Sequence, residues 1–195
     1  MKYLMNICFI FFITCANTAH NKDFQYFKEN NIVEESKLKL YNIWDKIYNR
    51  DEEISQTDIR TLKLIEAKAN QLNNSDIFYN LGVVYMNISD SFRAEKWMAK
   101  AAELLHPYAF HNIGWWYEHG FGHIEEDKSI AARFYNIAFW ELGVARSGTR
   151  ISEMIFYDEV AKFDANYAID TLSHLLSQSD EFNLDKKAIT YANFL

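Results

Sequence analysis

The sequence predicts an all-α protein of one domain, on three observations. The chain has 195 residues, of which 49% are apolar or aromatic and 24% are charged, which is enough apolar material for one packed core. Six glycines and one proline are too few for the many turns of an all-β chain. A repeat with helical spacing organises the middle of the chain.

A pattern with a period of 37 residues marks the second helix of a repeated helix pair. It begins at Asp90, Asp127 and Asp164, and small or aromatic residues follow the first two at offsets of 4, 7, 8 and 11. The stripe consists of Ala94, Trp97, Met98 and Ala101 in the first copy and of Ala131, Phe134, Tyr135 and Ala138 in the second. These offsets place the stripe on one helical face. An Asp at its head is expected to cap the free N–H groups of the helix.

The first helix of each pair lies just upstream of this pattern. An apolar residue precedes both Gly82 and Gly114, and Tyr85 and Tyr117 follow these glycines by three positions. Glycine inside a helix costs about 1 kcal/mol relative to alanine, so we expect each glycine to allow close approach of the second helix. Pro107 is the only proline, and it suits the start of the first helix in the second copy.

Together these motifs resemble a known repeat family. Leu-Gly-x-x-Tyr, a Gly-x-Gly turn at Gly120 to Gly122 and Asp-x-x-x-Ala-x-x-(Trp/Phe) resemble the Sel1-like repeat, a relative of the tetratricopeptide repeat (TPR). The best copies span 76–105 and 107–143, and degenerate copies span about 40–73 and 150–177. The resemblance implies a right-handed α-solenoid of antiparallel helix pairs, with about eight helices in one domain over 20–195. Residues 185–195 read as a short terminal helix.

The first 19 residues have the pattern of a secretory signal peptide. A lysine near the start precedes a short apolar run, and small residues follow it. The run is about half the length that a membrane-spanning helix needs, so we expect no membrane span in the mature protein. We expect cleavage to place the protein in the periplasm or outside the cell. Lipidation of Cys15 is the weaker alternative, since Thr14 is a poor match at the preceding position.

Charge and motifs argue against nucleic-acid binding and catalysis. The net charge is −7, which removes the usual electrostatic attraction to phosphates. Four histidines fall in a short stretch, namely His106, His111, His119 and His123. Their spacing fits no zinc signature, and no Gly-x-Ser-x-Gly motif is present. We therefore expect no catalytic residues, no metal and no cofactor.

The predicted function is binding of another protein through a concave face. The expected partner-binding residues are Asn80, Val84, His111, Trp115, Trp116 and His119. Adjacent tryptophans on a helix point about 100° apart, so at least one of the pair is expected to reach the surface. The signal pattern and the repeats together predict an exported binding protein. Small exported Sel1-like proteins resemble immunity proteins, so the sharper version is an immunity protein that neutralises a secreted antibacterial effector. The alternatives are an envelope adaptor or scaffold and, less favoured, a cell-wall-directed hydrolase that uses the histidine region.

Overall fold

The computed structural model describes residues 30–50, 52–157, 167, 168, 170, 171, 173 and 174. Residues 30–157 form seven helices: an N-terminal helix over residues 30–50, then α2 (Gln56–Leu72), α3 (Ser75–Asn87), α4 (Ser91–Glu103), α5 (Pro107–His119), α6 (Lys128–Trp140) and α7 (Ala145–Phe156). In the described part of the sequence the only β-type pairing is an isolated bridge between Phe121 and Ile124. The all-α prediction is therefore confirmed for this part. The expected signal segment (1–19) and terminal helix (185–195) lie outside the described residues.

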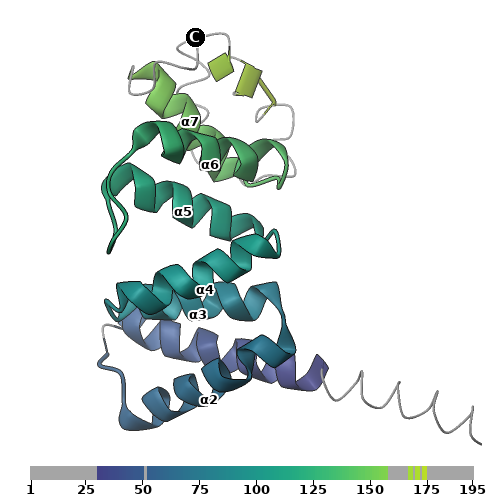
Figure 1. The fold of residues 1–195 in the computed structure, drawn as a ribbon, viewed down its shortest axis with the longest axis vertical. Helices are drawn as coiled ribbons and strands as arrows, with labels where there is room; N and C mark the ends of the chain where they lie inside the picture. Colours follow the sequence, from purple (N-terminus) through teal and green to yellow (C-terminus); the bar gives the residue numbers. More distant parts are fainter. Residues whose placement is uncertain (1–29, 51, 158–166, 169, 172, 175–195) are drawn as a thin grey trace, which may run out of the picture.

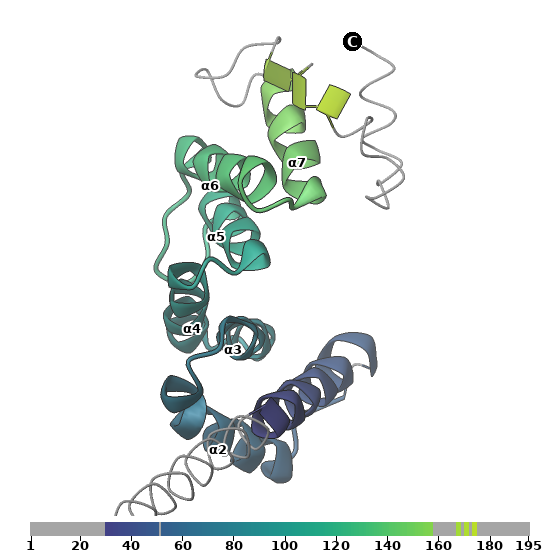
Figure 2. The same cartoon turned by 90° about the vertical axis from the view of Figure 1, so that its right-hand side faces the viewer.

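Neighbouring helices pack in sequence order, with α3 against α4, α5 against α6, and α6 against α7. The helices are stacked one after another along the long axis of the molecule (Figure 1). Seen from the side, the stack bends into an arc, and the N-terminal helix and α7 project toward the same side at its two ends (Figure 2). Within the ranges that the structure describes, no helix combines the length and apolar character that crossing a membrane requires.

Polar residues start the helices where the repeat pattern predicted them. Asp90 caps α4 by accepting a hydrogen bond from the Arg93 N–H, and Asp127 caps α6 in the same way. Pro107 is the first residue of α5, where its missing N–H costs nothing. Helix α2 is capped by Ser55 instead, and Asp58 at the third position of the helix completes a capping box by accepting from the Ser55 backbone N–H.

The repeated glycines lie where a second helix comes close. A Cβ at Gly82 would stand 3.1 Å from Met98 Cε and 3.4 Å from the Ala94 carbonyl oxygen. A Cβ at Gly114 would stand 2.9 Å from Tyr135 Cε1 on α6. The expected close approach of the helices in each pair is therefore confirmed. On the second helix of each pair, the alanines of the stripe are fully buried at these contacts. Trp97, Met98 and Tyr135 are fully buried there too.

The Gly-x-Gly turn between α5 and α6 reaches back to the preceding helix pair. Gly122 has φ +60°, and a Cβ there would collide with Glu95 and Ser91 of α4. The backbone N–H of His123 donates to Glu95 Oε1 at 3.0 Å. Glycine is needed at this position for both the left-handed backbone and the close approach. The turn thus ties the second copy of the repeat to the first.

Candidate functional site

A hollow of about 380 Å³ lies between the N-terminal helix, α3 and α5. We call it the aromatic groove, and its lining residues are Leu40, Tyr41, Trp44 and Tyr48 from the N-terminal helix, Tyr79, Asn80, Val83, Met86 and Asn87 from α3, and Asn112 from α5. The N-terminal helix contributes a ladder of rings, because Trp44 stacks on Tyr48 at 5.2 Å and lies 5.6 Å from Tyr41. Tyr41 and Tyr48 are exposed. Such a surface can hold an apolar side chain while remaining open to solvent.

Two asparagines in this groove occupy the same repeat position. Asn80 and Asn112 each stand two residues before the glycine of their copy, Gly82 and Gly114, and both line the aromatic groove. A carboxamide offers one acceptor oxygen and two donor hydrogens, which matches the C=O and N–H groups of an extended backbone. The repeat register contained the signal for Asn112, which the sequence-based prediction missed.

A second hollow of about 190 Å³ lies between α5, α6 and α7. We call it the α5–α7 hollow, and it is lined by His111, Trp115, Tyr135, Arg146, Thr149, Arg150 and Glu153. His111 and Asn112 are neighbours on α5, so one helix contributes to both hollows. Tyr79 of the groove lies 6.2 Å from Tyr108, measured between ring centroids, and the guanidinium of Arg146 lies over the Tyr108 ring at 4.5 Å. Tyr108 therefore lies between Tyr79 of the groove and Arg146 of the α5–α7 hollow.

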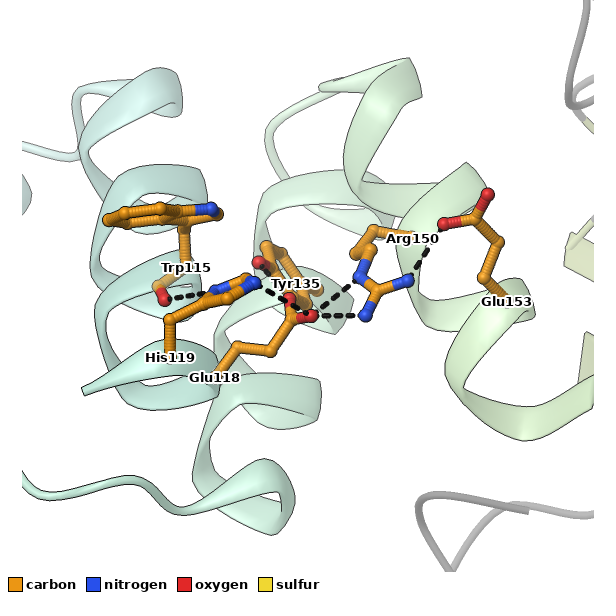
Figure 3. Close-up of polar contacts among 6 residues, drawn as sticks. All are labelled: Trp115, Glu118, His119, Tyr135, Arg150 and Glu153. Carbon is orange, nitrogen blue, oxygen red and sulfur yellow. Dashed lines mark hydrogen bonds and ion pairs between the residues drawn. The ribbon is translucent and has the colours of Figure 1, made fainter. Parts of the chain in front are cut away.

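The base of the α5–α7 hollow is a buried polar network centred on Glu118 (Figure 3). Glu118 is 4% exposed, and its carboxylate accepts hydrogen bonds from the Tyr135 hydroxyl at 2.7 Å and from Arg150 Nε at 2.8 Å. Arg150 Nη1 also donates to Glu153 at 2.8 Å. Burial alone would raise the pKa of Glu118, but the hydrogen bonds from Arg150 and Tyr135 hold it below its usual value. A charged carboxylate therefore links α5, α6 and α7.

The two adjacent tryptophans of α5 diverge as expected. Trp115 is 43% exposed, whereas Trp116 is 1% exposed. The Trp115 ring stacks on His119 at 4.7 Å, and His119 Nδ1 donates to the Trp115 carbonyl oxygen at 3.0 Å. Trp116 instead stacks on Phe121 of the following turn at 4.8 Å. Of the two tryptophans, only Trp115 lines the α5–α7 hollow.

His111 links α5 to α7 rather than acting as a base. Its Nδ1 forms a hydrogen bond with Ser147 Oγ at 2.8 Å, and Ser147 is 0% exposed. Burial, reinforced by the nearby charge of Arg146, lowers the pKa of His111 to about 4. Such a ring is neutral at pH 7 and a weak proton acceptor, and the buried hydroxyl is out of reach of a substrate. The pair therefore gives no support to the hydrolase alternative.

The structure separates the six predicted binding residues into two groups. Asn80 lines the aromatic groove, His111 and Trp115 line the α5–α7 hollow, and His119 stacks beside Trp115. Val84, which is 1% exposed, and Trp116 lie instead in the core cluster. Both belong to the helix faces that pack against neighbouring helices, so they stabilise α3 and α5 without presenting surface to a partner.

The histidine stretch does not converge on one point. His106 lies 3.5 Å from Asp76, His123 lies 3.5 Å from Glu95, and His111 faces Ser147. Among the described residues no group of three or more His, Cys, Asp or Glu side chains is arranged to hold a metal ion.

The two hollows are lined by aromatic rings, by asparagine carboxamides and by the arginines of α7. Rings and carboxamides of this kind can contact a peptide segment. No family model matches the sequence, and no curated protein matches it.

Proposed function

We propose that this protein is an exported protein-binding protein of Sel1-like, TPR-like solenoid architecture that engages a partner through its concave face. The observation that carries the proposal is the equivalent placement of Asn80 and Asn112, which line one aromatic groove from successive first helices. The arc of helices, with its two ends projecting toward the same side, supports the same proposal.

The bound segment is an extended stretch of the partner. The two carboxamides pair with its backbone C=O and N–H groups, and the rings of Tyr41 and Trp44 receive an apolar side chain. Backbone pairing supplies affinity that is tolerant of sequence, and the pocket supplies specificity. Trp and Tyr are favoured anchors in such surfaces because they bury a large area at a low entropic cost.

The experiment is affinity capture with the protein from His20 onward, in extracts of the native organism. Asn80→Arg places a long cation in the groove, and Asn70→Arg is the matched control because Asn70 is exposed on α2 and lines neither hollow. We expect a partner that the wild type and the control retain and the groove variant loses, with all three proteins equally folded. A partner retained by the groove variant would refute this assignment of the surface.

The immunity version of the proposal is tested on the captured partner. If the partner is a secreted hydrolase or toxin, stoichiometric addition of this protein should inhibit it, and the Asn80→Arg variant should not. An envelope protein that keeps its activity in the complex would favour the adaptor alternative. Export rests on the N-terminal pattern of residues 1–19. The mass of the protein recovered from the periplasm tests it, and an added lipid on Cys15 would identify the lipoprotein alternative.

A further inference from the structure

We infer that Arg146 forms a subsite for an acidic side chain of the partner, next to the aromatic groove. The segment that binds would then carry an apolar residue for the groove and an aspartate or glutamate that meets Arg146. This inference rests on the proposed function, since it specifies the chemistry of the segment that the groove receives.

Arg146 lines the α5–α7 hollow and has no acidic partner among the described residues, whereas Arg60 and Arg133, which form no ion pair there either, line neither hollow. Arg50 pairs with Asp45 at 2.8 Å, Arg93 pairs with Asp90, and Arg150 pairs with both Glu118 and Glu153. Within the described ranges no carboxylate forms an ion pair with Arg146.

The contacts that Arg146 does make hold it in place without neutralising it. Its guanidinium lies over the Tyr108 ring, 4.5 Å from the centroid, and that ring lies 6.2 Å from the ring of Tyr79, which lines the aromatic groove. A cation held over a ring keeps its charge and its remaining N–H donors. Those donors match the two oxygens of a carboxylate.

The position of Arg146 is set by the next turn of α7. Arg150 is locked to α5 through Glu118 (Figure 3), and Arg146 stands four residues earlier, on the same helical face. Both line the α5–α7 hollow. Arg146 lies in the first turn of α7, where the helix dipole disfavours a cation. A role in recognition accounts for a charge kept at this position.

The surroundings favour the end of the hollow near Tyr79 of the groove. His111 carries no charge at pH 7, because its pKa is lowered to about 4 by burial and by Arg146. Glu153 also lines the hollow, where it accepts a hydrogen bond from Arg150. Its negative charge repels an anion from that end of the hollow, so the end near Tyr79 is left for the acidic side chain of the partner. Trp115 lines the same hollow as Arg146. A partner chain that meets Arg146 can therefore extend within the hollow, which favours an internal acidic side chain over a terminal carboxylate.

The test uses the mature full-length protein and a random peptide library displayed between two fixed domains, so that no peptide has a free terminal carboxylate. Selections are run on the wild type, on Arg146→Glu and on Arg133→Glu. The control residue, Arg133, is exposed on α6 and lines neither hollow. We expect the wild type and the control to enrich an aspartate or glutamate at a fixed distance from an apolar residue. The Arg146→Glu variant should lose that enrichment while it still selects the apolar residue.

A synthetic peptide from the wild-type selection gives the quantitative test. Replacing its acidic residue by the corresponding amide should weaken binding to the wild type about tenfold and should change binding to Arg146→Gln little. If Arg146→Glu still enriches an acidic residue, the inference fails while the proposed function stands. The same holds if the wild type selects apolar peptides that carry no acidic residue. If the wild type selects no peptide, the proposed function fails together with the inference.

Discussion

Replacing Gly114 by alanine should destabilise the protein, although alanine is the better helix former. The new Cβ would lie 2.9 Å and 3.0 Å from two atoms of the Tyr135 ring and 3.3 Å from the Ala131 carbonyl oxygen. The ring cannot move away easily, because its hydroxyl is bound to Glu118 at 2.7 Å and its centroid lies 5.3 Å from that of the His111 ring. The substitution must therefore separate α5 from α6 or displace a buried hydrogen-bond network.

The magnitude follows from two opposing contributions. Alanine in place of glycine stabilises a helix by about 1 kcal/mol, whereas overpacking a core contact costs about 1–3 kcal/mol. At Gly82 the nearest atoms are Met98 Cε at 3.1 Å, the end of a flexible side chain, and the Met98 backbone nitrogen at 3.2 Å, so no contact falls below 3.0 Å and the overpacking should be milder than at Gly114. At Gly114 the obstacle is a fixed ring. We expect Gly114→Ala to be less stable than Gly82→Ala by about 1–2 kcal/mol.

Urea unfolding of the mature protein, followed by circular dichroism, measures this difference. Tyr135→Phe supplies an internal control, because it frees the ring from Glu118. The cost of Gly114→Ala should then fall by about 0.5 kcal/mol or more in the Tyr135→Phe background. Equal stabilities for Gly114→Ala and Gly82→Ala, or a stabilised Gly114→Ala, would show that the helices are not in contact at this glycine.

Three further measurements address the α5–α7 hollow. Glu118→Gln should lower the free energy of unfolding by about 2–3 kcal/mol, because it leaves Arg150 without its buried partner; a loss under about 0.5 kcal/mol in urea would contradict that network. Acid should also destabilise the fold. The His111 pKa is about 4 when folded against an ordinary value of 6.5, so the unfolded protein gains protons as the pH falls below 6.5. The loss should be about 2 kcal/mol between pH 7 and pH 5, and a His111→Asn variant should lose less than the wild type. Trp115→Ala should change stability by less than about 0.5 kcal/mol yet weaken partner binding at least about tenfold; unchanged binding would exclude Trp115 from the interface.

Much of the helical framework was predictable because it depends on local periodicity. The buried stripe from Ala94 to Ala101, the aspartate cap at Asp127 and the close approach at Gly82 all follow from residues a few positions apart. Helix geometry alone decides which of these residues share a face. The same reasoning established that one of the two adjacent α5 tryptophans must be exposed, since neighbours on a helix diverge.

The candidate site depended on contacts between distant parts of the sequence. The pairing of Arg150 with Glu118 spans 32 residues, and that of His111 with Ser147 spans 36. Arg146 and Arg150 lie one helical turn apart. Their spacing along the sequence does not reveal that, among the described residues, Arg150 pairs with a carboxylate and Arg146 does not. Likewise it did not reveal that Val84 is buried. The sequence by itself determined the helices and their buried stripes, because the helical period is a local property. The tertiary structure decided which polar groups are neutralised and which face a partner, because ion pairing and burial depend on the neighbours that packing brings together.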